Sequence, residues 1–307
     1  MLDGPFTISE ALAAGLTREQ LRSKRWNAPF RGVYQPRETP PTLAAQCQAL
    51  ARLLPPEAAF TGITAARLRS WWLPAGATSA PLHITVPPDR LITRPGVRST
   101  RRVLDESDVI DVGGLRVTSG LRTLRDLAAD WSLIDLVMMA DAALRFGHCT
   151  SNEWAVAAAL SGGRGVCTLR RATTLTDARS ESPMETVLRL LIVIPGLPAP
   201  LPQAILRDEC GGWLAQVDLL APDGLSVLEY DGASHETGAR HDSDVRRWRM
   251  LRRHGFEVFP YTKRDLFFGW RQILTDYQTA LGLPDDPRAA QAWLREWERS
   301  SFRRRRS

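Results

Sequence analysis

Lysine is nearly absent from this 307-residue chain. Only two of its 40 basic residues are lysines, Lys24 and Lys263, so arginine carries almost all of the positive charge. The guanidinium group of arginine is planar and can pair with a phosphate through two hydrogen bonds. The net charge of +6 at pH 7 suits a nucleic-acid partner, and it suits equally well a surface charge that only keeps the protein soluble.

Closely spaced cysteine pairs are missing as well. The four cysteines, Cys47, Cys149, Cys167 and Cys210, are far apart and form no CxxC motif. This spacing argues against a zinc site and against a disulfide framework. We expect buried free thiols in a reducing cytoplasm.

Long apolar runs are also missing. No stretch approaches the roughly 20 apolar residues that a membrane-spanning helix needs. The longest candidates, 133–144 and 187–194, are interrupted or flanked by charge. Asp3 and Glu10 interrupt the N-terminus, where a signal peptide would carry its apolar core. We therefore expect a cytoplasmic protein without a membrane partner.

Residues 1–38 predict a small winged helix-turn-helix domain. Thr7–Glu10 and Thr17–Gln20 fit the capping-box pattern, which predicts helices over 8–14 and 18–25. Residues 26–34 then predict a β-wing. The second helix would read DNA with its basic face, and a packing module with a solvated basic face is the alternative. The basic residues of this helix are Arg18, Arg22, Lys24 and Arg25.

Residues 39–175 predict an α/β middle domain, reached through the proline-rich segment 36–41. No cluster of catalytic residue types lies in this domain. The segment Ser161–Gly165 predicts a flexible break, and it does not fit a phosphate-binding loop because no strand precedes it. The predicted helices cover 43–54, 61–68, 121–129 and 133–146, and the predicted strands cover 82–86 and 115–118.

Residues 176–284 predict a third domain with the element order α-β-β-β-α-β-α, and 285–307 form a basic tail. Ser182, Pro183 and Glu185 are typical of a helix start. The turn Ala221–Gly224 separates two strands of a hairpin. The predicted strands cover 201–207, 213–220, 226–231 and 256–261, and the predicted helices cover 183–194, 243–254 and 262–281.

Acidic residues in this hairpin are the strongest functional signal. Side chains alternate along a strand, so Glu229 and Asp231 share a face, and the turn places Asp218 opposite Glu229. Cross-strand Cβ atoms are about 5 Å apart. Two carboxylates at that distance repel each other without a cation, and Mg²⁺ prefers such oxygen ligands. The pattern predicts a divalent-cation site that hydrolyses phosphodiesters.

The string Glu229–His235, followed by Asp244–Arg247 and Leu251–Val258, resembles the DUF559 family. That family belongs to the PD-(D/E)XK nuclease superfamily and is related to very short patch repair endonucleases. The resemblance covers about residues 180–270 and implies a restriction-endonuclease-like domain. Residues 4–35 resemble the winged helix of AbiEi-type antitoxins, which implies an AbiEi-like N-terminal region.

The resemblance implies that Asp218 and Glu229 bind the metal and that Glu185 completes its ligand shell. The lysine that the superfamily places two residues after the glutamate is Asp231 here. Asp231 would then add a ligand, and His235 would act as a general acid or base near neutral pH. The structural alternatives are that Glu185 only caps its helix, that Asp231 only ends its strand, and that His235 only hydrogen-bonds the turn.

Arginines on the predicted helix 243–254 are a second set of candidate DNA contacts. They would bind phosphates, which position a duplex without specifying its sequence, and a solvated charged face is the alternative. We expect Trp293 and Trp297 to dock a further helix, and the tail Phe302–Arg306 to be disordered and to add salt-sensitive affinity. The candidate DNA contacts are Arg246, Arg247, Arg249 and Arg253.

These features predict a metal-dependent DNA endonuclease with Mg²⁺ or Mn²⁺ as its cofactor, and the family resemblance fits a role in defence or repair. The missing superfamily lysine favours the alternative, a non-catalytic DNA-binding regulator of antitoxin type with a degenerate nuclease domain. RNA stays open as a substrate, and a homodimer stays open as the assembly.

Overall fold

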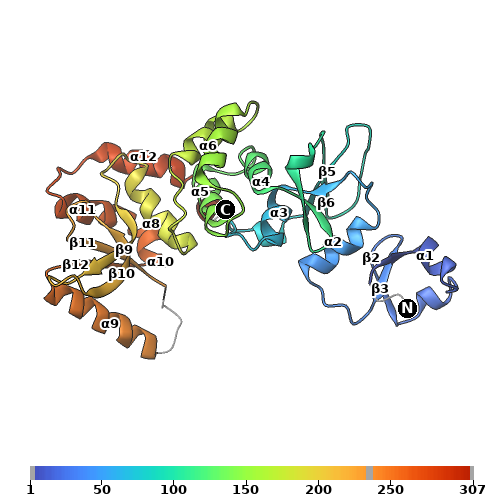
Figure 1. Ribbon diagram of the computed structural model, residues 1–307, viewed down its shortest axis with the longest axis horizontal. Coiled ribbons are helices and arrows are strands. Elements are labelled where there is room, and N and C mark those ends of the chain that lie inside the picture. The colour runs from blue at the N-terminus through green and yellow to red at the C-terminus, as the bar shows by residue number, and fades with distance from the viewer. Residues whose placement is uncertain (1–3, 233–237, 305–307) are drawn as a thin grey trace. The chain divides into compact units, whose positions relative to one another are not determined.

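The computed structural model describes residues 4–232 and 238–304, and it divides the chain into two compact units, Met1–Leu127 and Ala128–Ser307. Within the described residues both units combine helices with β-sheet, so the chain is a mixed α/β protein, as predicted (Figure 1). The division falls inside the predicted middle domain 39–175. No helix in the described part of the chain is both long enough and apolar enough to cross a membrane.

A three-stranded sheet of order β1-β3-β2 opens the first unit. Thr7 and Glu10 cap α1 reciprocally, which confirms the first predicted helix. Phe6 packs edge-on against Trp26, with ring centroids 5.0 Å apart, and forms a small core there. The elements are β1 Phe6–Thr7, α1 Ile8–Ala13, the 3₁₀ turn η1 Gln20–Arg22, β2 Trp26–Phe30 and β3 Val33–Pro36.

The predicted DNA-reading helix over 18–25 is wrong. Thr17 and Gln20 exchange the two expected capping hydrogen bonds, of 3.2 and 2.7 Å, but only the short turn η1 follows. Leu21 is the buried residue of this turn, so the segment lacks the apolar face that would stabilise a longer helix. The basic candidates are exposed on the turn and its flanks: Arg18, Arg22, Lys24 and Arg25.

A five-stranded sheet of order β6-β5-β4-β8-β7 forms the second part of the first unit. Phe60, Ile84 and Val117 are at most 2% exposed and form its core with Leu50 of α2. The sequence did not predict β4, β6 or β7. The elements are α2 Leu43–Ala51, β4 Ala59–Phe60, α3 Gly62–Leu68, η2 Ala77–Ser79, β5 Leu82–Val86, β6 Val97–Arg101, η3 Glu106–Asp108, β7 Val109–Val112, β8 Leu115–Thr118 and α4 Gly120–Leu127.

The second unit opens with the helices α5 Leu133–Arg145, α6 Ser151–Leu160 and α7 Val166–Thr173. Asp141 of the buried helix α5 forms a 2.7 Å ion pair with the buried Arg189. The predicted break lies between α6 and α7. Its Gly165 has φ +84°, and a Cβ there would lie 2.4 Å from the carbonyl oxygen of Ala128, so the chain requires glycine at this close approach.

A four-stranded sheet of order β12-β11-β10-β9 is the centre of the second unit. Strands β9, β10 and β11 are antiparallel neighbours, and β12 runs parallel to β11. Helix α8 packs against β10 and β11, and α9 packs against β10 and β12 (Figure 1). The predicted order of these elements is confirmed. They are α8 Pro183–Val193, β9 Leu201–Arg207, β10 Trp213–Leu220, β11 Ser226–Asp231, α9 Gly238–Arg253 and β12 Glu257–Thr262.

The predicted helix over 262–281 is two helices, because Gly269 separates α10 from α11. Trp293 and Trp297 of α12 are buried and stack with ring centroids 5.4 Å apart, which confirms the docked helix. The last elements are α10 Lys263–Phe268, α11 Trp270–Ala280, α12 Pro287–Trp297 and α13 Ser301–Arg304.

Phe302 corrects the prediction that the tail is disordered from this residue on. Its ring stacks on Trp297 at 5.8 Å and meets Phe267 edge-on at 5.6 Å. The buried carboxylate of Asp135 accepts hydrogen bonds from the backbone nitrogen and hydroxyl of Ser301, at 3.0 and 2.7 Å. Aromatic packing and these bonds therefore hold α13, and 305–307 lie outside the described residues.

The cysteine prediction is correct for two of the four thiols. Cys47 and Cys149 are buried, and Cys167 and Cys210 are exposed. Burial raises the pKa of the Cys47 thiol to about 12, so this cysteine stays a neutral core residue.

Candidate functional site

The strand register builds a polar row across the second unit's sheet. In the β10–β11 hairpin Leu219 pairs with Leu228 and Leu220 with Val227. The same register continued by one position would place Asp218 opposite Glu229, and the charge of Glu229 acts on Asp218. Between β9 and β10, Ala204 pairs with Val217 and Pro202 pairs with Leu219, so Gln203 lies next to Asp218. The row therefore runs from Gln203 through Asp218 to Glu229 over three strands, and side chains of one row share a face.

Glu185 reaches this row from the first turn of α8. Ser182 caps the helix by accepting a hydrogen bond from the Glu185 nitrogen. The Glu185 carboxylate does not close a capping box with Ser182. Its Oε2 accepts hydrogen bonds from the Glu181 nitrogen at 2.7 Å and from Gln203 Nε2 at 2.8 Å. Glu185 is therefore tied to the sheet, and this contact goes beyond helix capping.

Asp218 lies among carboxylates that raise its pKa to about 7. Burial is the largest cause, followed by the negative charges of Glu229 and Glu185. A hydrogen bond of 2.7 Å from the Tyr230 nitrogen to Oδ2, and the charge of Arg247, act in the opposite direction. These repulsions indicate that the carboxylates of Glu185 on α8 and Glu229 on β11 lie near that of Asp218 on β10.

Arg247 of α9 binds both oxygens of Glu229. Its Nη1 donates to Oε1 at 2.9 Å and its Nη2 donates to Oε2 at 2.6 Å. Nη1 also donates to the Gln216 carbonyl oxygen at 3.3 Å. Arg247 was expected to bind a DNA phosphate, and instead it neutralises a carboxylate that was expected to bind metal.

The carboxylate donors of the site are of the type that binds a hard divalent cation, but they are not arranged to hold one. Carboxylate oxygens are the ligands that Mg²⁺ prefers, and Asp218 lies beside two more of them. However, among the residues that the structure describes, no group of three His, Cys, Asp or Glu side chains is placed to hold a metal ion. The Arg247 guanidinium occupies the Glu229 oxygens that would bind a metal ion, so a metal site that uses Glu229 would require Arg247 to move.

Two glutamines complete the site, and we did not predict either of them. Gln203 Oε1 accepts a 2.5 Å hydrogen bond from Gln216 Nε2, so Gln203 links Glu185 to the hairpin. The backbone of Gln203 has φ +52°, a left-handed conformation that costs about 1–3 kcal/mol outside glycine. The available sequence signal was that Gln216 alternates with Asp218 along β10.

The other predicted residues do not join this cluster in the same way. Asp231 ends β11 opposite Thr262 and is partly buried. His235 lies outside the described residues, so its predicted role as an acid or base stays a prediction. The other three arginines of α9 that were predicted to contact DNA are exposed, as phosphate contacts must be: Arg246, Arg249 and Arg253.

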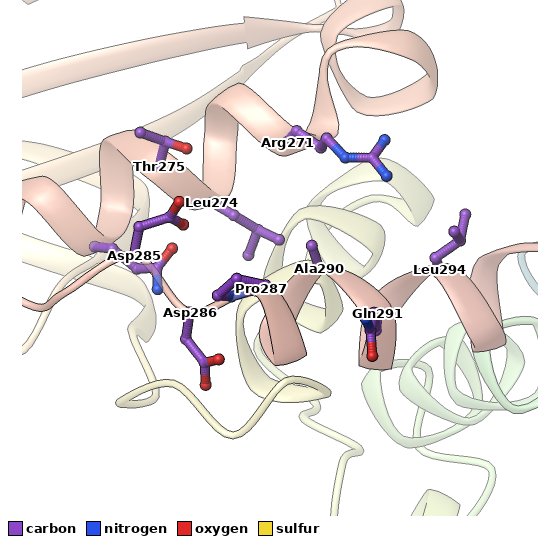
Figure 2. A pocket seen from close by; sticks show the side chains of 10 residues that line it. Arg271, Leu274, Thr275, Asp285, Asp286, Pro287, Ala290, Gln291 and Leu294 are labelled. Atoms are coloured by element: carbon purple, nitrogen blue, oxygen red, sulfur yellow. The ribbon is translucent and has the colours of Figure 1, made fainter.

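A surface cleft of about 340 Å³ lies between α11 and α12, well separated in sequence from the carboxylate cluster (Figure 2). Asp285, Asp286 and Arg271 are among the charged residues that line it. Asp286 caps α12 by accepting a 2.9 Å hydrogen bond from the Arg288 nitrogen. The cleft shares no residue with the row on the sheet, and its acidic cap has a structural role.

Comparisons with known proteins add no activity to this geometry. No family model matches the chain, and no solved structure matches it. Two uncharacterised proteins, from two strains of Mycobacterium tuberculosis, are each 34% identical to it over 128 residues, which is 41% of this chain and 47% of theirs. The chain thus spans about half the length of the relatives that it matches.

Proposed function

We propose that the second unit is a metal-dependent nuclease that hydrolyses phosphodiester bonds in DNA. The observation that carries this proposal is the grouping of Glu185, Asp218 and Glu229. Burial, and then the negative charges of Glu229 and Glu185, raise the pKa of Asp218 to about 7. A fold has no structural need to place three carboxylates together, because each buried charge is costly without a partner. A shared divalent cation accounts for all three.

The element order supports the same proposal. A helix with Glu185 is followed by a hairpin with Asp218 and then Glu229, a further helix, and the strand β12, which runs parallel to β11. This order resembles that of a restriction-endonuclease-like domain of the PD-(D/E)XK superfamily. Of the described residues that resemble DUF559, Glu229–Asp231 end β11, Asp244–Arg247 and Leu251–Arg253 lie on α9, and Glu257 and Val258 begin β12. The AbiEi-like N-terminal region would help to select the DNA.

Asp218 and Glu229, with Glu185, would hold the Mg²⁺ or Mn²⁺ ion. When bound, such an ion polarises the phosphate and makes the attacking water more acidic. Gln203 keeps the Glu185 carboxylate directed at the row through its 2.8 Å hydrogen bond. Asp231 brings no positive charge where the superfamily has lysine, so the charge that stabilises the phosphate must come from elsewhere in this site.

Exposed arginines would position the nucleic acid. On α9 these are Arg246, Arg249 and Arg253, and near η1 they are Arg18, Arg22 and Arg25. Contacts of this kind neutralise phosphates and weaken as salt rises. They do not distinguish one sequence from another, and RNA stays open as a second substrate.

A specific observation favours a second candidate function, a DNA-binding regulator whose nuclease domain no longer cuts. Arg247 already neutralises Glu229, and Asp231 replaces the superfamily lysine. A domain that keeps the three carboxylates but holds Glu229 permanently in an ion pair with Arg247 would bind DNA through its other arginines without hydrolysing it.

Cleavage of supercoiled plasmid separates the two candidates. We expect Mg²⁺-dependent cleavage by the wild type and its loss in Asp218→Asn and in Glu229→Gln. The matched control is Asp208→Asn, which changes a carboxylate that only accepts hydrogen bonds from the turn nitrogens of Cys210 and Gly212. Cleavage by all four proteins alike would refute the assignment. DNA binding without cleavage by the wild type would favour the regulator, and a parallel RNA substrate tests the choice of nucleic acid.

A further inference from the structure

We propose that Arg247 is an internal counter-cation that keeps the candidate site closed, and that it releases Glu229 when a divalent cation binds. This inference rests on the proposed metal site of the second unit. It concerns the regulation of that site. It assigns this role to Arg247 of α9, which neither the strand register nor the order of elements would identify.

The ion pair has the geometry of a cation substitute. Glu229 is 4% exposed, and a buried carboxylate requires a compensating charge. Arg247 supplies that charge through two parallel hydrogen bonds, of 2.9 and 2.6 Å, which involve both carboxylate oxygens. A divalent ion on the same oxygens would meet a fixed positive charge at hydrogen-bond distance. Metal and guanidinium therefore compete for Glu229.

The two partners differ in their freedom to move. The Arg247 side chain is 31% exposed, whereas that of Glu229 is 5% exposed. Arg247 can swing toward water on its long flexible stem, and its additional bond to the Gln216 carbonyl is 3.3 Å long. The release of Glu229 therefore begins with a movement of the Arg247 side chain, the more exposed of the two partners.

The other two carboxylates are held by groups that do not depend on Arg247. Asp218 is fixed by the Tyr230 nitrogen. Glu185 is fixed by the Glu181 nitrogen and by Gln203. The strands and α8 can therefore stay in place while the guanidinium leaves. The carboxylates of Asp218 and Glu185 would then close on the vacated Glu229 oxygens, because no three such side chains of the described residues are placed to hold an ion in the closed state.

Metal binding itself is the decisive measurement. If the closed form dominates, the apparent affinity for the ion is reduced by the fraction of open molecules. Titration calorimetry or electron paramagnetic resonance with Mn²⁺ alone should show that Arg247→Ala binds the ion about tenfold more tightly than the wild type. Arg252→Ala is the matched control, because this guanidinium on the same helix donates only to the Val258 carbonyl, at 3.1 Å, and it should bind Mn²⁺ like the wild type.

Two further variants place the effect at this site. Asp218→Asn in the Arg247→Ala background should abolish the gain in Mn²⁺ affinity. Arg247→Lys keeps a positive charge but not the paired hydrogen bonds, so its affinity should lie between those of the wild type and Arg247→Ala. An Arg247→Ala protein that binds Mn²⁺ no more tightly than the wild type overturns the proposal, as does a gain that survives Asp218→Asn.

Thermal unfolding covers the case in which Arg247→Ala folds poorly. This variant leaves the buried Glu229 without its counter-ion, so it should unfold at a lower temperature than Arg252→Ala in the absence of metal. Mn²⁺ should raise its unfolding temperature more than that of Arg252→Ala. Equal shifts for the two variants contradict the exchange. If Arg247→Ala cannot be purified, the same comparison with Arg247→Lys decides.

The outcome also separates this inference from the nuclease proposal. Plasmid cleavage that depends on Asp218, together with equal Mn²⁺ affinities of the wild type and Arg247→Ala, leaves the nuclease standing and removes the exchange. Tighter Mn²⁺ binding by Arg247→Ala without cleavage by the wild type leaves the exchange standing and removes the nuclease.

Discussion

Asp218→Asn should stabilise the protein at alkaline pH, and this prediction tests the electrostatics of the site without any assumption about catalysis. The pKa of Asp218 is raised from its ordinary value of 3.8 to about 7. The folded protein therefore holds the Asp218 proton more firmly than the unfolded chain does. Asparagine removes the charge, and its side-chain oxygen can still accept the hydrogen bond from the Tyr230 nitrogen.

The size and sign of the effect follow from the pKa difference. At pH below 3.8 Asp218 is protonated in both the folded and the unfolded state, and asparagine changes little. As pH rises from 3.8 to about 7 the unfolded state ionises freely while the folded state resists, so the wild type loses stability. The full shift corresponds to about 4 kcal/mol. Water reaches the partly exposed Asp218, so we expect a gain of about 2–4 kcal/mol for Asp218→Asn above pH 7.

Urea unfolding followed by tryptophan fluorescence at a series of pH values measures this difference. The free energy of unfolding of Asp218→Asn minus that of the wild type should be near zero in acid, rise through the slightly acidic range and level off above pH 7. Carbon NMR of the Asp218 carboxyl gives a direct check, because Glu185→Gln removes one of the two negative neighbours of Asp218 and should lower this pKa below its wild-type value. A difference that is independent of pH, or an asparagine variant that is less stable above pH 7, would refute the reasoning.

Two further predictions concern the frame around the site. Gly165→Ala should destabilise the protein by about 2–5 kcal/mol, because the backbone is left-handed there and the new Cβ would overlap with Ala128. The control Gly163→Ala has φ +88° and no atom within 4 Å of its new Cβ, so it should cost only about 1–2 kcal/mol. Equal shifts of the unfolding temperature for the two variants would contradict the close approach at Gly165. Arg189→Met should cost about 3–5 kcal/mol in urea unfolding, because it leaves Asp141 buried without its ion pair, and adding Asp141→Asn should recover part of this loss. No recovery would show that the pair is not the cause.

Local signals predicted the second unit's sheet well. The predicted strand bounds 201–207, 213–220 and 226–231 agree with the structure. The alternation of apolar and polar residues and the turn Ala221–Gly224 are properties of short stretches of sequence, so they can be recognised without knowledge of distant contacts. The same stretches set the register of Leu219 with Leu228, and counting one position further predicts Asp218 opposite Glu229.

Features that depend on distant contacts were missed. The capping box at Thr17 formed as expected, yet it says nothing about helix length, which depends on packing that η1 lacks. Arg247 reaches Glu229 across 18 positions only after α9 has docked, and a run of arginines on one helix does not show which of them turns inward. Neither does a strand pattern reveal that Gln203 adopts a left-handed backbone.

The charge of the cluster is compatible with the proposed exchange between a closed and a metal-bound state near neutral pH. In the closed state two ionised glutamates, a protonated Asp218 and Arg247 leave one net negative charge. In the open state three ionised carboxylates and a divalent ion would again leave one. The ion would thus replace a guanidinium and a proton. Mn²⁺ binding should therefore release close to one proton at about pH 6, about half a proton near pH 7, and fewer above that pH, where Asp218 ionises by itself. Calorimetric titration in buffers with different ionisation enthalpies measures that proton. Binding without proton release at the lower pH would mean that Asp218 is not a ligand.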